Sequence, residues 1–244
     1  MEPGEYDRMH AVEDDMWWYA GAHANALAGL ARYGRDPGGA ILDAGCGTGG
    51  LLRKLAVAWP TRAMVGLDYD GRACVMAQAK SGKATVCGSV DCLPFADRAF
   101  GAIVSLDVLC HRNVNDRAAL DEMSRCLAPG GVLILNLPAY DWMMSYHDHQ
   151  VQTARRYNRN ELLALVAASG LETRRITYWN SFLFPVMVLR RKLLPASGAS
   201  DVTSYPSWLN RIFRGMLSLE RRLIAAGIGL PFGGSLLSIA VKHG

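Results

Sequence analysis

The chain has 244 residues; half of them are hydrophobic, a fifth are charged, and the formal net charge is +4. This composition is ordinary for a soluble globular protein, and no repeat or low-complexity segment is visible. The acidic start, "MEPGEYDRMHAVEDD", lacks the apolar stretch of a signal peptide. Six cysteines without metal-ligand spacing predict free, mostly buried thiols in a reducing cytoplasm.

Apolar runs alternate with helical patterns along the chain, which predicts an α/β fold with a mostly parallel sheet and helices on both faces. Seven short segments are expected to be its strands, at residues 40–45, 63–68, 84–90, 102–109, 132–138, 172–179 and 236–242. Helices are predicted between them at residues 50–59, 70–81 and 115–127. A further helix is expected from Asn158 to Gly170, because Glu161 follows Asn158 at the spacing of a capping box.

Residues 181–234 form an insert between the last two predicted strands. The insert carries a formal charge of +5, whereas the rest of the chain carries −1. An apolar stripe predicts an amphipathic helix over residues 207–225, formed by Leu209, Ile212, Phe213, Met216, Leu217, Leu223 and Ile224. The basic residues fit a solvated helix face, an anionic substrate, an acidic partner or a membrane surface.

The end of the insert belongs to an uncharged stretch, residues 223–241, that is almost long enough to span a bilayer. Pro231, Gly233 and Gly234 interrupt it, so we expect a helix end, a turn and a strand, and no transmembrane segment. An apolar stripe must be buried against something. The helical insert is therefore expected to cover the ligand-binding side of the domain or to form an interface in a homodimer.

The stretch "ILDAGCGTGG", residues 41–50, predicts a ligand-binding loop between a strand and a helix. Its glycines allow backbone N–H groups to approach a ligand closely. Two patterns fit: G-x-G-x-x-G, which is typical of dinucleotide sites, and D-x-G-x-G-x-G, which begins at Asp43. Asp68 closes the next predicted strand, where a carboxylate can accept ribose hydroxyls in either class of site. Asp43 favours the second pattern, because a carboxylate there can receive an ammonium group.

The segments "LPF" (93–95), "LDVLCH" (106–111) and "LAPGGVLIL" (127–135) complete a series of ordered motifs. From Ile41 to about Pro138 the chain resembles the class I S-adenosyl-L-methionine-dependent methyltransferases of the small-molecule type. The resemblance implies a Rossmann-like seven-stranded sheet, S-adenosylmethionine as the cofactor and methyl transfer as the activity. It also implies a set of cofactor-binding residues: Trp18, Tyr19, Asp43, Gly45, Cys46, Gly47, Asp68, Tyr69, Ser89, Val90, Leu106 and His111.

The N-terminal part, residues 1–36, resembles the family's capping helix, which closes over the cofactor. In that resemblance Trp18 and Tyr19 form an aromatic wall beside the sulfonium; the alternative is that the tryptophans pack the helix on the sheet. The chain departs from the family after the third strand, where Ser89 stands in place of a frequent aspartate.

The acceptor is expected beyond the fifth strand, where "AYDWMMSYHDHQVQTARRY" (139–157) gathers aromatic and titratable groups. His147 and His149 are candidate general bases, with Asp148 or Asp141 orienting one of them, and His111 is a third candidate. The candidate substrate-binding residues are Tyr140, Trp142, Tyr146, Arg155, Arg156 and Tyr157. The alternative is a surface loop whose arginines pair with nearby acids. No third ligand stands at a supportive spacing, so no metal site is expected.

The sequence therefore predicts a single cytoplasmic methyltransferase domain over residues 1–244. It is expected to methylate oxygen or nitrogen of a small-molecule acceptor, with an anionic acceptor as one reading of the basic insert. Two alternatives remain: a membrane-peripheral enzyme or one acting on a lipid-linked substrate, and a nicotinamide-dependent oxidoreductase. Nucleic acid is not expected as a partner, because basic and aromatic residues interleave only modestly.

Overall fold

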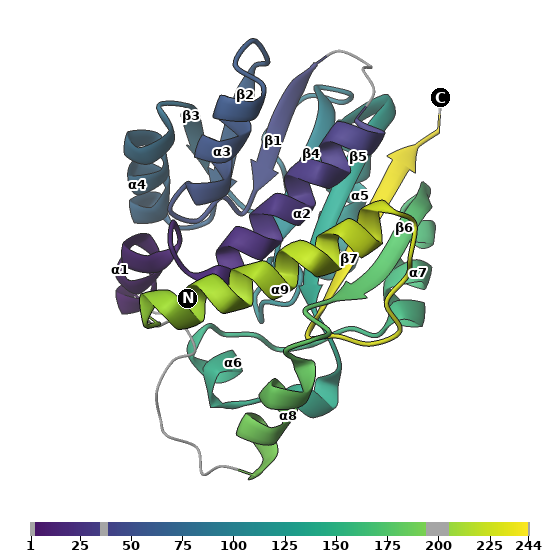
Figure 1. Cartoon of the computed structure of the whole chain (residues 1–244). Helices are drawn as coiled ribbons and strands as arrows, with labels where there is room; N and C mark the ends of the chain where they lie inside the picture. The colour runs from purple at the N-terminus through teal and green to yellow at the C-terminus, as the bar shows by residue number, and fades with distance from the viewer. Residues whose placement is uncertain (1–2, 35–38, 194–204, 244) are drawn as a thin grey trace.

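A seven-stranded sheet forms the centre of the computed structural model, which describes residues 3–34, 39–193 and 205–243 (Figure 1). The strands are β1 (Ala40–Ala44), β2 (Met64–Asp68), β3 (Ala84–Cys87), β4 (Phe100–Leu106), β5 (Leu127–Pro138), β6 (Leu171–Trp179) and β7 (Ser235–Lys242). Their order is β3-β2-β1-β4-β5-β7-β6, and only β7 runs antiparallel to its neighbours. The predicted seven-stranded, mostly parallel sheet is confirmed.

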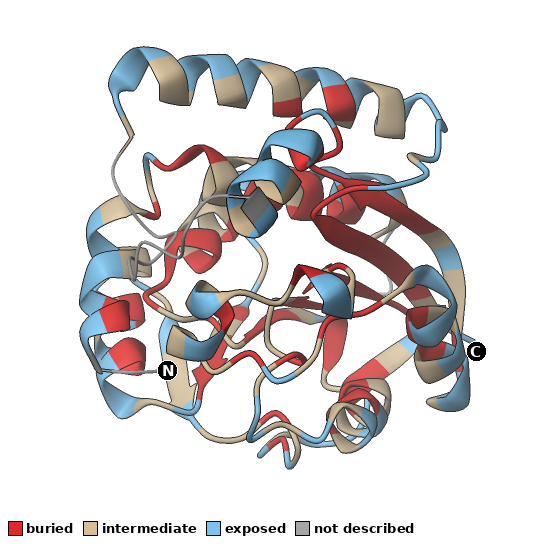
Figure 2. Cartoon of the chain, turned by 90° about the horizontal axis from the view of Figure 1, so that it is seen from below, coloured by how far each residue is buried: buried red, intermediate tan, exposed pale blue. Residues whose placement is uncertain are grey.

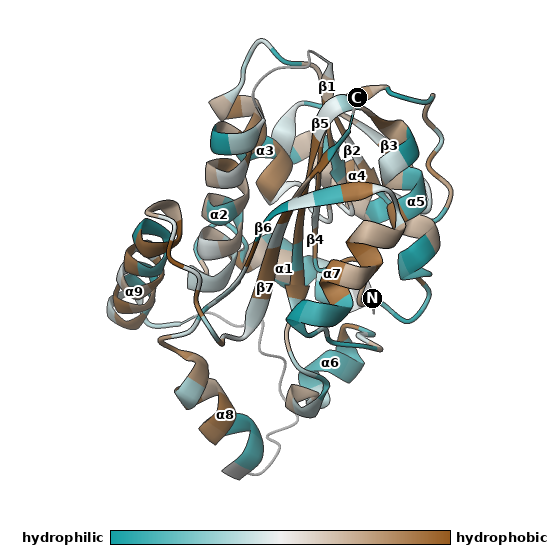
Figure 3. Ribbon diagram, turned by 90° about the vertical axis from the view of Figure 1, so that its right-hand side faces the viewer, coloured by the Kyte–Doolittle hydropathy of each residue, from teal (hydrophilic) through white to brown (hydrophobic). Residues whose placement is uncertain are grey.

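Helices cover both faces of the sheet (Figure 3). They are α1 (Pro3–Val12), α2 (Trp17–Tyr33), α3 (Gly50–Ala58), α4 (Gly71–Ser81), α5 (Asp116–Cys126), α6 (Tyr146–Gln150), α7 (Arg159–Ala168), α8 (Phe184–Leu193) and α9 (Ser207–Ala225), with a 3₁₀ turn at Asp141–Met143. Two buried clusters fill the space between layers, one with α2 and α3 and the other with α5 and α7. Adjacent residues of β1, Ile41 and Leu42, belong to different clusters, because successive strand side chains point to opposite faces.

Local signals set the helix ends that the sequence predicted. The Asn158 side chain accepts hydrogen bonds from the backbone N–H groups of Asn160 and Glu161, while Glu161 accepts one from the Asn158 N–H. This capping box begins α7 as expected. At α4, Asp70 caps the first turn and Gly82 ends the helix in a left-handed conformation.

The N-terminal region differs from the expected capping helix. It contains two helices, α1 and α2, and the chain turns between them at residues 13–16. The turn is required because Glu13 reaches the glycine-rich loop, as described below. All six cysteines are free and four of them are buried, as the sequence predicted.

The insert folds as two helices in its described part, α8 and α9. The helix predicted at 207–225 is confirmed, as are the helix end, turn and strand over residues 223–241. No helix among the described residues has the length and apolar character needed to cross a membrane. α9 packs along α2, where a Cβ added to Gly21 would lie only 2.6 Å from Leu217 Cδ1. The backbone N–H of Trp17 also donates to Asn210 Oδ1 at 2.7 Å.

Candidate active site

A cavity of about 520 Å³ lies at the carboxyl ends of the parallel strands, at the end of the molecule seen in Figure 2. Its volume is within the range of small-molecule sites. The walls come from the loops after β1, β2 and β4, from the N-terminal segment and from α6 and α8. Ligands of open α/β sheets bind at this edge.

The loop after β1 requires glycine at several positions. Gly45 and Gly49 adopt positive φ angles of 88° and 91°. A Cβ on Gly45 would lie 2.1 Å from Val108 Cγ2, and one on Gly49 would lie 2.6 Å from Ala77 Cα. The N–H of Gly45 donates to the carbonyl of Leu67 at 2.7 Å, which ties the loop to β2. The loop thus presents bare backbone to the cavity.

Asp43 stands just before this loop and is almost completely buried, at 2% exposure. Its Oδ2 atom has no hydrogen-bond partner in the described structure, and the residue lines the cavity. Burial, together with the charges of Asp68 and Glu13, raises the pKa of Asp43 to about 8. A buried carboxyl with an unpaired oxygen suits a cationic ligand group such as an ammonium.

Asp68 ends β2 on the other side of the loop. Its carboxylate accepts hydrogen bonds from the N–H of Gly47 at 2.9 Å and from the hydroxyl of Tyr6 at 3.1 Å. Burial and the neighbouring Asp68 carboxylate raise the pKa of Tyr6 above its ordinary value, so this hydroxyl remains a donor. Tyr6 belongs to α1, which therefore reaches the position where a ribose would bind.

The aromatic residues that begin α2 fill both of the roles expected for them, which are to line the cavity and to pack the helix in place. Trp18 and Tyr19 line the cavity and meet edge to face, with ring centroids 5.1 Å apart. Trp17 also borders the cavity but packs against Phe213 of α9, at 5.4 Å. Trp18 therefore faces the cavity, whereas Trp17 also packs against the helical insert.

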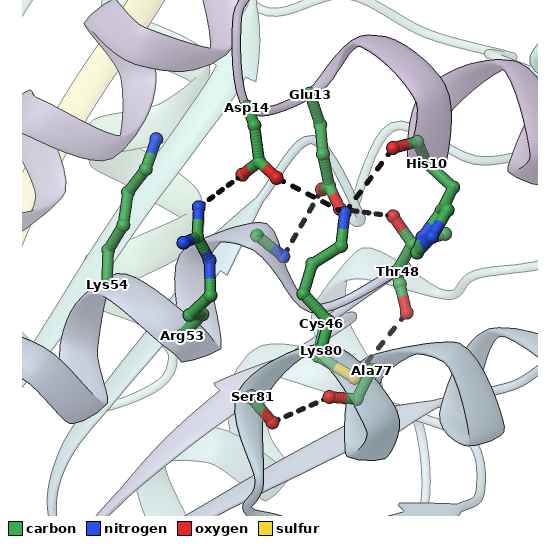
Figure 4. Close-up of polar contacts among 12 residues, drawn as sticks. His10, Glu13, Asp14, Cys46, Thr48, Arg53, Lys54, Ala77, Lys80 and Ser81 are labelled. Atoms are coloured by element: carbon green, nitrogen blue, oxygen red, sulfur yellow. Dashed lines mark hydrogen bonds and ion pairs between the residues drawn. The ribbon is translucent and has the colours of Figure 1, made fainter.

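A buried ionic cluster fastens the α1–α2 turn to the glycine-rich loop (Figure 4). The Glu13 carboxylate accepts hydrogen bonds from the Thr48 hydroxyl, from the Gly50 N–H at 3.2 Å and from the Lys80 ammonium. At the exposed edge of this cluster, Asp14 adds an ion pair with Arg53 at 2.6 Å. Burial alone would raise the pKa of Asp14, but the charges of Arg53 and Lys80 hold it below its usual range. The N-terminal segment is thereby anchored over the loop.

Asp107 is a cavity residue that the sequence analysis did not single out. It adopts a positive φ of 55° directly after β4, and its Oδ1 accepts a hydrogen bond from Asn136 Nδ2 at 2.8 Å. The Trp179 Nε1–H donates to Asn136 Oδ1 at 2.6 Å, which fixes the orientation of that amide. Burial raises the pKa of Asp107 to about 7, although the Asn136 hydrogen bond opposes this shift. Asp107 is therefore a carboxyl that can exchange a proton near neutral pH.

The three candidate histidines occupy different positions. His111 and His147 line the cavity, whereas His149 is exposed on the outer side of α6 and does not. The His111 Nδ1 atom is buried without a hydrogen-bond partner, and burial lowers the pKa of His111. His111 and His147 therefore remain candidate general bases that line the cavity, whereas His149 does not line it.

Asp148 and Asp141 do not orient a histidine, contrary to the expectation. Asp148 pairs with Arg156 at 2.7 Å, and both side chains are buried. Burial alone would raise the pKa of Asp148, but the charges of Arg156 and Arg191 hold it below its usual range. Asp141 accepts a hydrogen bond from the Arg156 N–H at 2.8 Å. Both acids therefore hold Arg156 in place.

Of the six predicted substrate-binding residues, only Arg156 lines the cavity. Arg155 pairs with Asp116 at 2.8 Å, and the Tyr157 hydroxyl donates to the Leu109 carbonyl at 3.0 Å. These two residues brace the loop after β4. The three aromatic residues lie outside the cavity wall: Tyr140, Trp142 and Tyr146.

All twelve residues predicted to bind the cofactor line the cavity. The N-terminal segment adds residues that the motifs did not reveal, namely Tyr6 and Met9 of α1 and Glu13 of the following turn. The described residues contain no cluster of His, Cys, Asp and Glu suited to a metal ion. An unpaired acid beside a bare glycine loop and a second acid at the end of β2 fit the ammonium and ribose groups of S-adenosylmethionine.

Comparison with known proteins agrees with this site. Residues 42–135 match the family model described as a methyltransferase domain. This match identifies residues 42–135 as a methyltransferase domain, for which S-adenosylmethionine is the cofactor.

Individual relatives are more distant. The chain is 34% identical over 131 residues to "Probable tRNA methyltransferase 9B" of Mus musculus, a match that covers 53% of this chain and 26% of that protein. The chain thus spans about a quarter of the length of this relative.

Two solved structures share the fold. The complex of the Haloferax volcanii Trm112 methyltransferase activator contains a chain with a TM-score of 0.63 and 22% identity, with 99% of this chain and 95% of that chain covered. The Haemonchus contortus phosphoethanolamine N-methyltransferase 2 in complex with S-adenosylmethionine has a TM-score of 0.59 and 17% identity, with coverage of 89% and 52%.

Proposed function

We propose that the protein transfers a methyl group from S-adenosylmethionine to oxygen or nitrogen of a small acceptor that carries an anionic group. The observation that carries this proposal is the pairing, in one cavity, of a cofactor-like pocket with a basic wall. The unpaired Asp43, the glycine-rich loop and Asp68 form the pocket. Arg156, Arg190 and Arg191 contribute to the wall.

The cofactor pocket assigns roles to this chain's residues. Asp43 receives the ammonium group of the methionine moiety. Asp68 accepts hydrogen bonds from the ribose hydroxyls, in place of the bond from the Tyr6 hydroxyl or in addition to it. Trp18 and Tyr19 border the pocket with aromatic surface, which favours a neighbouring cationic sulfonium. When bound, S-adenosylmethionine supplies an electrophilic methyl group, so the protein's main task is to align an acceptor and exclude water.

Asp107 supplies the proton acceptor in this proposal. It lies beyond β4, lines the cavity, and is oriented by Asn136 and Trp179. A hydroxyl acceptor must lose its proton as it is methylated, and a base with a pKa near 7 is well matched to that task. His111 and His147, which share the cavity, are positioned to hold the acceptor or to pass its proton onward.

The acceptor side of the cavity is positive. Arg190 and Arg191 come from α8, and Arg156 comes from the segment before α7. Asp148 offsets one unit of this charge, since it pairs with Arg156 at 2.7 Å and with Arg191 at 3.6 Å. The remaining charge favours a phosphate or carboxylate on the acceptor, because guanidinium groups bind both with charge-assisted hydrogen bonds.

A panel assay tests the proposed acceptor class. S-adenosylhomocysteine formation would be measured with small alcohols and amines that carry a phosphate or carboxylate, with their neutral analogues, and with bulk tRNA. We expect turnover of an anionic small acceptor, and we expect Arg190→Gln to raise its KM several-fold with little change in kcat. Arg98→Gln, a change at an exposed arginine away from the cavity, is the matched control. Turnover on tRNA alone would replace the small acceptor with nucleic acid.

A further inference from the structure

The insert leaves a large apolar surface exposed. Eight of its hydrophobic side chains are between 42% and 63% exposed. We call this set the insert surface: Phe182, Val186, Leu189, Trp208, Ile212, Leu219, Ile228 and Phe232. Only five other large hydrophobic residues in the described chain are comparably exposed, so the insert holds most of them. Exposed apolar side chains that are concentrated in one segment of a chain are a mark of interaction sites.

The folded domain leaves roughly half of each of these side chains uncovered. α9 has an inner face, on which Leu217 is buried and Phe213 and Met216 pack against the core around α2. On its outer face, Trp208, Ile212 and Leu219 recur at helical spacing and point away from that core. Figure 3 shows apolar and hydrophilic segments alternating along α8 and α9. The apolar stripe of α9 is therefore wider than the part that the domain covers.

The exposed charges of the insert have one sign among its described residues. Arg211, Arg214 and Arg222 are exposed on α9, and Lys192 is exposed on α8. Among the insert residues that the structure describes, the only acid is Glu220, which is buried and accepts a hydrogen bond from the Phe182 N–H at 2.6 Å. Tryptophan and aliphatic side chains flanked by arginines are typical of helices that lie at the surface of anionic membranes.

The insert surface adjoins the mouth of the cavity. Met187, Arg190 and Arg191 of α8 line the cavity, while Val186 and Leu189 of the same helix are exposed. Tyr205, just before α9, also lines the cavity. A surface docked through α8 and α9 would therefore lie beside the acceptor entrance.

We propose that the insert surface docks on a membrane that contains anionic lipids. The apolar side chains enter the interfacial layer, and the surrounding arginines and lysine contact lipid phosphates. Docking in this orientation places the acceptor entrance at the membrane. The delivery of an amphiphilic acceptor from the membrane to the cavity rests on the proposed function.

Vesicle co-sedimentation of the full chain tests the proposal. Vesicles of phosphatidylcholine alone would be compared with vesicles that also contain phosphatidylglycerol. We expect binding to the anionic vesicles only, and we expect added salt to weaken it. The triple variant Trp208→Ser, Ile212→Ser, Leu219→Ser is expected to bind roughly tenfold or more weakly, because most of the apolar surface of α9 is then lost. Each of Arg211→Gln, Arg214→Gln and Arg222→Gln is expected to weaken binding by roughly fivefold.

Matched controls use exposed residues elsewhere. Val57→Ser with Val75→Ser removes apolar side chains that are even more exposed from α3 and α4, and Arg98→Gln removes an exposed charge. These variants should sediment like the original chain. Absence of sedimentation with anionic vesicles, or equal loss in the control variants, overturns the proposal. A dimer that the triple variant abolishes, without vesicle binding, would instead assign the surface to a second copy.

Titration with S-adenosylhomocysteine separates this inference from the proposed function. The triple variant should retain the affinity of the original chain, because its changed residues lie outside the cavity wall. Loss of vesicle binding with intact cofactor binding concerns the docking surface alone. A chain that binds vesicles but no S-adenosylhomocysteine would contradict the proposed function and leave the docking surface standing.

Discussion

The carboxyl of Asp43 should release a proton when the cofactor binds. Its pKa in the empty cavity is about 8, because burial disfavours the charged form. A cationic ammonium against the carboxylate lowers that pKa, so binding at pH 7 should release close to one proton. Calorimetric titration of S-adenosylhomocysteine in two buffers with different ionisation enthalpies measures this release.

Asp43→Asn should abolish the proton release and weaken binding, whereas Asp121→Asn, in an exposed ion pair with Arg117, should do neither. Unchanged proton release in Asp43→Asn would show that another group titrates.

The raised pKa of Asp43 also has a consequence for stability. The unfolded chain loses this proton near pH 4, so the contribution of Asp43 to the free energy of unfolding of the empty protein should fall as pH rises from about 4 toward 8.

Asp107 should set the pH dependence of catalysis. A base must be ionised to accept a proton, and the pKa of Asp107 is about 7. With a hydroxyl acceptor, kcat/KM should therefore rise with pH through about 7 and level off above it. Asp107→Asn should lower kcat by roughly 10²–10⁴-fold while cofactor affinity changes little.

A variant of the supporting amide distinguishes this role from a structural one. Asn136→Asp removes the donor that fixes Asp107 and places a second acid beside it, which should move the pH profile to higher pH. A pH profile that stays the same in both variants would remove Asp107 from the mechanism and leave His111 or His147 as the base.

Residues 155–157 show why the substrate-binding residues of the acceptor side were harder to predict than the cofactor-binding residues. Residues 155–157 run in an extended segment beside Ala139, so their side chains alternate in direction. Arg156 therefore points to the cavity and pairs with Asp148, while Arg155 and Tyr157 point to Asp116. Nothing in "ARRY" distinguishes the two directions, because the choice depends on acids from other segments.

At the scale of elements, the α1–α2 turn should control access to the cofactor. Glu13→Gln removes the charge that holds Lys80 and weakens the hydrogen bonds from Thr48 and Gly50. We expect the free energy of unfolding to fall by about 1.5–3 kcal/mol, the scale of a buried hydrogen bond to a charged group. Urea unfolding measures the change, and S-adenosylhomocysteine affinity should fall with it.

Asp7→Asn is the matched control for this prediction, because Asp7 makes an exposed ion pair with Arg72 at 3.5 Å. Exposed pairs contribute only about 0–1 kcal/mol. If the two variants lost the same stability, the buried cluster would not be what anchors the N-terminal segment.

The elements themselves followed from local patterns to different degrees. All seven strands and the capped helix α7 were predictable, since apolar runs and capping residues act locally. The break between α1 and α2 was not, because it depends on Glu13 reaching residues 35 and 67 positions away in the sequence. Asp107 was not predicted as a site residue because the predicted strand continued to residue 109. In the structure β4 ends at Leu106, and Asp107 turns into the cavity.

At the scale of the whole molecule, the cofactor half of the site was predictable and the acceptor half was not. Cofactor residues sit in short motifs at strand ends, so their positions follow once the sheet order is known. The acceptor wall is assembled from α6, α8 and the segment before α7, which the chain brings together only through tertiary packing. The insert illustrates this, since its apolar stripe predicted that the helix is buried against something, but neither the contact with α2 nor the exposed apolar side chains of α9.

The central claim is that the cavity at the carboxyl ends of the strands binds S-adenosylmethionine through Asp68 and its neighbours. Calorimetric titration of S-adenosylhomocysteine into the original chain and into Asp68→Ala tests it most directly, with NADH as the competing cofactor. We expect binding of S-adenosylhomocysteine and not of NADH, and a loss on the order of 1–3 kcal/mol in Asp68→Ala, whose ribose partners are left unpaired. Binding of NADH, or equal affinity of the two chains for S-adenosylhomocysteine, would contradict the assignment.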